Sequence, residues 1–150
     1  MGYYVTITNS NAVIPSCNID MAYDAVMALN SRDELKRGGS WPGSDKPKPE
    51  GMEYHPDKWF SWMPANLREL KTLPEVLDAL GFGCHVEDGG DLLIETYDSK
   101  IGQEDIFFEV LAPYLHPSSV IEWRGEDGYQ FRWVFENGVM RLQEAVISWE

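Results

Sequence analysis

The chain has 150 residues, of which 43% are hydrophobic and 13% aromatic, a size and composition that support a packed core and argue against intrinsic disorder. Its formal net charge is −13. Residues 1–75 hold ten acidic and eight basic side chains, whereas residues 76–150 hold fifteen and four. Because an acidic surface repels phosphate groups, this composition argues against direct binding of nucleic acids or anionic membranes.

The first thirty residues predict a strand, a turn and a helix. Apolar and polar side chains alternate between residues 3 and 8, which is typical of a strand with one buried face. After a turn at 9–11, residues 12–14 are expected to return as a short strand. Asn18 is a suitable N-cap, and the apolar residues after it follow a helical period, so we expect a helix that ends near Asn30.

The segment 31–66 differs from the rest of the chain. It is rich in proline and glycine, which interrupt regular structure, and it holds six of the twelve basic side chains. Three of the six tryptophans, Trp41, Trp59 and Trp62, also lie here. Two interpretations remain open: a surface loop that its aromatic side chains pin to the core, or a binding loop whose tryptophans stack on a ligand or a partner.

The middle of the chain contains local signals for a short helix and two strands. Thr72 and Glu75 form a capping-box pattern, and Gly81 is placed to end the helix that follows. Residues 82–86 alternate as a strand, and residues 91–97 are expected to return after a Glu-Asp-Gly-Gly turn. These patterns predict a helix followed by a hairpin.

A further helix is expected before Pro117. Apolar side chains share one face of it, and Pro113 and Pro117 limit its length. The acidic side chains of its first turns are expected to lie largely outside that face. They are Glu104, Asp105 and Glu109.

The last stretch of the chain predicts a three-stranded meander. A run at 120–124 has strand character, residues 129–136 alternate with a period of two, and a third run covers 139–149. Four turn-forming residues, 125–128, connect the first two runs, and Asn137-Gly138 connects the last two. The aromatic face of the middle strand consists of Tyr129, Phe131, Trp133 and Phe135. Such a meander can nucleate a core.

Together the elements predict a single α+β domain over residues 1–150. We expect an antiparallel sheet of about five to seven strands that includes the C-terminal meander and packs against two or three helices. The Pro/Gly/Trp-rich loop at 31–66 lies within this domain. On the polar face of the meander, Arg124 and Arg132 lie beside Glu122 and Glu136, which predicts cross-strand ion pairs.

Several stretches resemble a family of small uncharacterised proteins encoded by bacteriophages, especially those of actinobacterial hosts, and by related bacteria. They are the Met-Gly-Tyr-Tyr start, residues 35–40, residues 60–63, and residues 121–128 with the later Trp133. The resemblance spans most of the chain. It implies an intracellular setting in an infected bacterium and an interaction with a host protein, and it supplies no catalytic residues.

We find no pattern of catalysis, metal binding or cofactor binding. The three histidines are far apart in the chain, and the two cysteines form no Cys-x-x-Cys pair, so no zinc site is predicted. The acid-rich turns do not fit a calcium loop, and neither a nucleophile motif nor a phosphate-binding motif occurs. With reduced thiols and no apolar run of about 18 residues, a cytoplasmic protein without a membrane segment is expected.

The leading prediction is a non-enzymatic acidic protein that binds a protein partner. The predicted binding residues are the loop tryptophans Trp41, Trp59 and Trp62 and the turn acids Glu126 and Asp127. Two alternatives remain open. One is a small-molecule or nucleotide binder, or a small enzyme, with its pocket under the 31–66 loop. The other is an acidic mimic of DNA, whose carboxylates would have to be spaced like phosphates.

Overall fold

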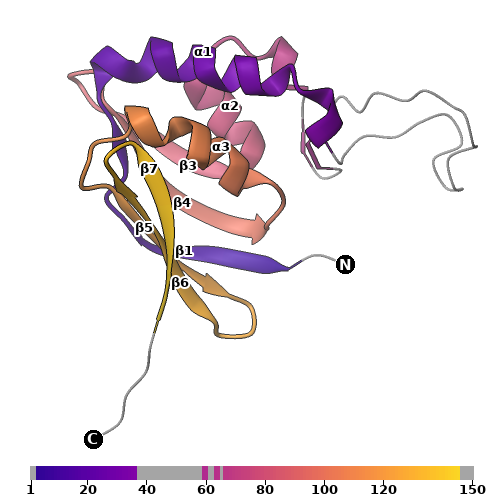
Figure 1. Cartoon of the computed structure of the whole chain (residues 1–150), viewed down its shortest axis with the longest axis vertical. Helices are drawn as coiled ribbons and strands as arrows, with labels where there is room; N and C mark the ends of the chain where they lie inside the picture. The colour runs from indigo at the N-terminus through magenta and orange to yellow at the C-terminus, as the bar shows by residue number, and fades with distance from the viewer. Residues whose placement is uncertain (1–2, 37–58, 61–62, 65, 146–150) are drawn as a thin grey trace, which may run out of the picture.

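The computed structural model describes residues 3–36, 59–60, 63–64 and 66–145. Within them the chain forms a seven-stranded antiparallel sheet and three α-helices. The three helices lie together on one side of the sheet (Figure 1). This arrangement confirms the predicted single α+β domain with a C-terminal three-stranded meander.

The elements follow the predicted order along the chain. The strands are β1 (Tyr4–Ser10), β2 (Val13–Ile14), β3 (Phe82–Val86), β4 (Leu92–Lys100), β5 (Val120–Gly125), β6 (Gln130–Glu136) and β7 (Val139–Glu144). The helices are α1 (Ile19–Asn30), α2 (Leu73–Leu80) and α3 (Glu104–Leu111). Short 3₁₀ turns are η1 (Ser16–Asn18), η2 (Asp33–Leu35), η3 (Leu67–Glu69) and η4 (Ala112–Tyr114). Among the described residues, no helix has both the length and the apolar character needed to cross a membrane.

The sheet is built around β4 and β1. β1 pairs with β4 and with β5, and the order continues through β6 to β7 at the edge. β3 pairs with β4 as the predicted hairpin. The predicted meander is confirmed, because β5, β6 and β7 pair in chain order through antiparallel ladders.

The short strand predicted at 12–14 is present as β2, but its predicted return along β1 is wrong, because β2 pairs with β4. Both strands run antiparallel to β4, so β2 continues in the direction of β1 after a bend. At the bend, Asn11 Oδ1 accepts a hydrogen bond from Val120 N (2.7 Å). The Ser10 hydroxyl donates to Ile94 O (2.6 Å). Neighbouring strands thus satisfy the polar groups that a hairpin turn would otherwise satisfy locally.

Local signals set the ends of α2, whereas the predicted cap of α1 differs. The Thr72 hydroxyl accepts a hydrogen bond from Glu75 N (3.4 Å), and α2 ends at Gly81, whose φ of +108° favours glycine. Asn18 precedes α1 as predicted, but its side chain makes no capping hydrogen bond. Its Nδ2 instead donates to Tyr114 O (3.1 Å), so a tertiary contact replaces the local one.

The core lies between the helices and the side of the sheet that faces them. The predicted aromatic face of β6 is confirmed at Trp133 and Phe135, which are buried. Glu136, the last residue of β6, is exposed. Four apolar residues near the C-terminal end of the 31–66 segment also enter this core. They are Trp59, Phe60, Met63 and Leu67.

Candidate functional site: the uncovered end of the sheet

The helices cover only part of the sheet, and β6 and β7 run beyond them (Figure 1). Along the helix-facing side of β6, Trp133 is 4% exposed, Phe131 is half-buried and Tyr129 is 40% exposed. On β7, Leu142 pairs with Trp133 and therefore shares its face, yet it is 58% exposed. The apolar face of the sheet thus continues past the helix layer into solvent.

A row of aromatic rings connects this uncovered end to the core. Trp123 and Phe131 stack with ring centroids 6.1 Å apart and an interplanar angle of 8°. Phe131 and Tyr129 stack at 5.5 Å and 26°. Tyr3 adds a fourth ring, because it lies directly over Gly125, where a Cβ would come within 2.4 Å of Tyr3 Cζ. Only glycine leaves room for this ring at the end of β5.

The predicted turn acids lie at the edge of these rings. Asp127 accepts hydrogen bonds from the Tyr3 hydroxyl and from Tyr129 N (3.1 Å). Glu126 Oε1 accepts a hydrogen bond from Tyr4 N (3.2 Å). The two acids therefore hold the first strand against the β5–β6 turn, and they place negative charge beside the exposed aromatic side chains.

The charges at this end shift the pKa values of the neighbouring phenols. The hydrogen bond to Asp127 raises the pKa of Tyr3 to about 12, and the same hydrogen bond lowers the pKa of Asp127. Glu144, which lies opposite Phe131 on β7, raises the pKa of Tyr129. At neutral pH both phenols remain protonated and the site keeps a carboxylate rim.

The structure places the predicted tryptophans differently from the turn acids. Trp59 is fully buried, packs edge-on against Phe107 at 4.8 Å, and donates its indole N–H to Asn30 Oδ1 (3.0 Å). Trp59 therefore anchors its part of the 31–66 segment to the core, as expected for a loop that its aromatic side chains pin. It has no exposed surface on which a ligand could stack. Trp41 and Trp62 lie outside the described residues.

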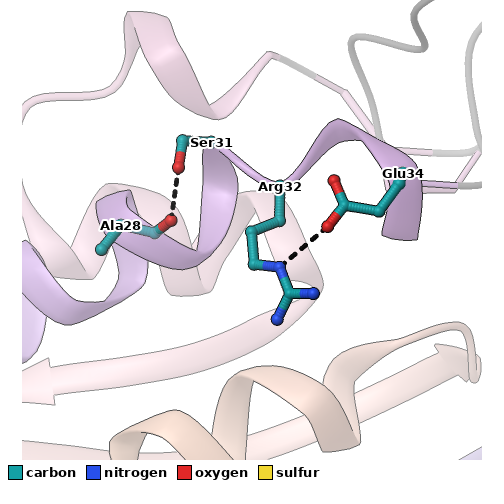
Figure 2. A network of polar contacts seen from close by, with 4 residues as sticks. All are labelled: Ala28, Ser31, Arg32 and Glu34. Atoms are coloured by element: carbon teal, nitrogen blue, oxygen red, sulfur yellow. Dashed lines mark hydrogen bonds and ion pairs between the residues drawn. The ribbon is translucent and has the colours of Figure 1, made fainter.

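The start of the 31–66 segment is held by short-range polar contacts. The Ser31 hydroxyl donates to Ala28 O (2.7 Å), and Arg32 Nε pairs with Glu34 Oε1 (2.9 Å) (Figure 2). Both side chains of this ion pair are more than half exposed, so it contributes about 0–1 kcal/mol. Trp59 gives the segment a tertiary anchor, which this exposed pair does not.

A second polar cluster, around Glu104, was missed by the sequence interpretation. Glu104 was expected outside the apolar face of its helix, but it is fully buried at the start of α3, so that expectation is wrong. Its carboxyl turns back to the β4–α3 connection, where it accepts hydrogen bonds from Gly102 N (2.9 and 3.1 Å) and contacts the Tyr97 hydroxyl. Gly102 is the one nearby residue that could have indicated this cluster, because a side chain at position 102 would collide with Phe60 and with the Glu104 carboxyl.

Burial raises the pKa of Glu104 to about 7, although the hydrogen bonds from Tyr97 and Gly102 oppose the rise. The hydrogen-bond geometry favours a protonated carboxyl. The Tyr97 hydroxyl contacts both Glu104 Oε2 and Lys100 O, and its one proton cannot serve two acceptors. A protonated Glu104 donates to the Tyr97 oxygen and frees that proton for Lys100 O. Because Glu104 has no exposed surface, we assign it to packing.

The described residues contain no group of three or more His, Cys, Asp or Glu side chains that could hold a metal ion. Burial raises the pKa of the Cys84 thiol to about 12, so this cysteine stays protonated at neutral pH and is a poor nucleophile or metal ligand.

No protein-family model, curated protein or solved structure matches the chain. Geometry therefore has to identify the site. Residue patterns had pointed to the turn acids, but they placed Tyr129 and Phe131 on a face expected to be buried. The packing of α3 and η4 decides how much of β6 the helices cover. The alternation of residues along β6 contains no information about that packing.

Proposed function

We propose that the protein is a non-enzymatic binding protein that docks a protein partner on the uncovered end of its sheet. The main support is the apolar face of the sheet, which continues beyond the helices. Trp133 is buried on this face, whereas its partner Leu142 on β7 is largely exposed. Apolar patches with a polar rim are typical of protein–protein contacts.

The chemistry of the patch defines the partner. Tyr129 and Tyr3 offer large rings with a polar tip, the residue type that contributes most at interfaces. Asp127, Glu126 and Glu144 add negative charge around them. The matching surface has an apolar centre and a basic rim, since opposite charges speed association and select the partner. The resemblance to bacteriophage proteins makes a host bacterial protein the first partner to test.

The other predicted functions have less support. A pocket under the 31–66 loop would involve residues 37–58, which lie outside the described residues. A mimic of DNA stays a prediction, and its carboxylates would need the spacing of phosphates on one face. At the uncovered end, by contrast, Asp127 and Glu126 are engaged with Tyr3 and Tyr4 N and frame an apolar surface.

The test compares two substitutions on one strand. Leu142→Ser removes an exposed apolar side chain from the helix-facing side of β7, and Val139→Ser removes one of similar exposure, 56%, from the opposite side. Affinity capture from host lysate, followed by titration of the purified retained protein, should show at least about tenfold weaker binding for Leu142→Ser and for Tyr129→Ser, and no loss for Val139→Ser.

Salt and hydrogen exchange complete this test. Binding should weaken as salt rises, because the acidic rim meets a basic one. Amide exchange on β6 and β7 should slow when the partner is bound. Equal binding by the Leu142→Ser, Tyr129→Ser and Val139→Ser proteins would contradict the proposed site, even if a partner is retained.

A further inference from the structure

One row of polar side chains crosses four strands on the side of the sheet away from the helices. Asn9 of β1 is the register partner of Glu122 on β5, Glu122 is the partner of Arg132 on β6, and Arg132 is the partner of Gln143 on β7. Neighbouring strands are about 4.8 Å apart, so these four side chains are consecutive neighbours on one surface. The two charged residues occupy the middle of the row.

The expected ion pair between these two residues is wrong. Glu122 Oε1 turns to Asn9 and accepts a hydrogen bond from its Nδ2 (3.0 Å). Arg132 Nε turns the other way and donates to Gln143 Oε1 (2.7 Å). Within the described part of the chain no ion pair joins the two charges. Each amide at the end of the row holds one charge away from the other.

A hollow of about 230 Å³ occupies this part of the sheet. Its lining includes Glu122, Arg132 and the Gln143 amide, together with Thr8 and Gln130. The remaining lining residues are Trp123, Phe131, Glu144 and Ala145. Arg132 keeps its two Nη groups, and Glu122 keeps its Oε2, without a hydrogen-bond partner among the described residues. The Arg132 guanidinium and the Glu122 carboxylate thus border one small hollow, each with unused hydrogen-bonding capacity, and a second carboxylate, that of Glu144, also lines it.

We propose that this hollow binds a small zwitterion, a molecule that carries an ammonium group and a carboxylate. The carboxylate pairs with the Nη groups of Arg132, whose planar fork suits two carboxylate oxygens. The ammonium group pairs with Glu122 Oε2, and the Thr8 hydroxyl and Gln130 amide add polar contacts. The volume is below that of pockets for drug-sized ligands, which restricts the ligand to the size of a free amino acid.

This site can be tested separately from the proposed protein-binding surface. Phe131 and Glu144 border both, but Tyr129 and Leu142 do not line the hollow, and Arg132 and Glu122 lie on the side of the sheet opposite to Leu142. Substitutions at these four positions therefore each probe one site.

The test is a titration of the whole chain, labelled with ¹⁵N, with zwitterions of increasing length. Glycine, β-alanine and γ-aminobutyrate serve as the length series, larger amino acids serve to probe the hollow's size, and acetate and methylammonium serve as single-charge controls. The side-chain resonances of Asn9, Arg132 Nε and Gln143 report on the row directly. At least one zwitterion should give a saturable shift of these resonances, with affinity about tenfold or more above both single-charge controls.

Matched variants separate the site from general electrostatics. Arg132→Gln and Glu122→Gln should each weaken zwitterion binding about tenfold or more, because each removes one charged partner. Arg141→Gln changes the net charge like Arg132→Gln, but Arg141 pairs with Glu136 (2.9 Å) and does not line the hollow, so binding should be unchanged. All three side chains are on the sheet surface, and an unchanged amide spectrum verifies the fold.

Three results would overturn this inference. One is the absence of a saturable shift for every zwitterion in the series. Another is acetate binding as tightly as the best zwitterion, which would identify a simple anion site at Arg132. The third is zwitterion binding that survives both Arg132→Gln and Glu122→Gln.

Discussion

Two tyrosine–carboxyl pairs, one under the helices and one at the uncovered end of the sheet, show how burial decides the behaviour of the same chemical contact. Under the helices, the Tyr97 hydroxyl contacts Glu104, which is fully buried. At the uncovered end, the Tyr3 hydroxyl donates to Asp127, which is exposed. The pKa of Glu104 is raised, mainly by burial, whereas the pKa of Asp127 is lowered, mainly by the hydrogen bond.

The difference follows from solvation. A hydrogen bond to a carboxylate favours its charged form, and loss of water disfavours that form. At Asp127 water remains, so the hydrogen bond dominates. At Glu104 water is gone, so burial dominates in spite of donors from Tyr97 and Gly102. The carboxyl under the helices therefore has a pKa near neutrality, whereas the carboxyl at the uncovered end keeps its negative charge.

The largest expected effect is on the free energy of unfolding, and it compares buried and half-buried aromatic side chains of β6. Trp133→Ala should lower the free energy of unfolding by about 3–5 kcal/mol, because it empties a buried site. Phe131→Ala, two residues closer to the uncovered end, should cost about 1–2 kcal/mol, because its ring is only half-buried. Glu136→Ala on the other face should cost well under about 1 kcal/mol. Chemical denaturation measures all three, and equal losses at 131 and 133 would contradict the boundary of the helix layer.

The next effect concerns the pH dependence of stability. The pKa of Glu104 rises from an ordinary value of 4.5 to about 7 on folding, so the folded state binds the proton more tightly. The stability that this proton contributes is complete below about pH 4.5 and is lost as pH rises through about 7, a decrease of roughly 3 kcal/mol.

Glu104→Gln tests this assignment. The amide imitates the protonated carboxyl, since it can donate to Tyr97 and accept from Gly102 N. Denaturation midpoints of the variant measured between pH 5 and 8 should lack the decrease found in the parent protein. Tyr97→Phe serves as a control that removes the hydroxyl but keeps the buried acid. Parallel pH profiles for the parent and Glu104→Gln would rule out a neutral Glu104 in the folded chain.

A smaller effect on stability is expected from the exposed Tyr3–Asp127 pair. Asp127 has a lowered pKa when folded, so its contribution to stability is present above its unfolded pKa, near 3.8, and is lost as pH falls through the folded value. Ultraviolet titration should find a phenol with a pKa near 12 that disappears in Tyr3→Phe. Asp127→Asn should move that phenol toward its ordinary pKa of 10.0, because it removes the charge and weakens the hydrogen bond. A Tyr3 pKa that is unchanged by Asp127→Asn would contradict the contact.

The smallest effect is an expected absence of binding. With a net charge of −13 and a carboxylate rim at its uncovered end, the protein should not retain random duplex DNA at low salt. A gel-shift series from low to high salt measures this. A retained complex that dissociates as salt rises would contradict the prediction and direct attention to the basic residues between 31 and 58.

Sequence patterns predicted the elements well where a few neighbouring residues decide the conformation. Asn137 and Gly138 both adopt positive φ, 54° and 75°, as the predicted hairpin requires. Thr72 caps α2 and Gly81 ends it, because the groups involved lie within one helical turn. Alternation along β6 identified the face that carries Trp133, because a strand presents every second side chain to the same side.

The tertiary structure alone decided which of these side chains meet. Tyr3 and Asp127 are 124 positions apart in the chain, and Asn9 and Glu122 are 113 apart, so neither contact leaves a local pattern. The same holds for Glu104, whose burial depends on β4 and on Phe60 from another part of the chain. Periodicity indicates the face on which a side chain lies, but its solvation and its partners depend on which distant segments cover that face. Such distant segments determine the protonation of Glu104, the exposure of Tyr129 and the separation of Glu122 from Arg132.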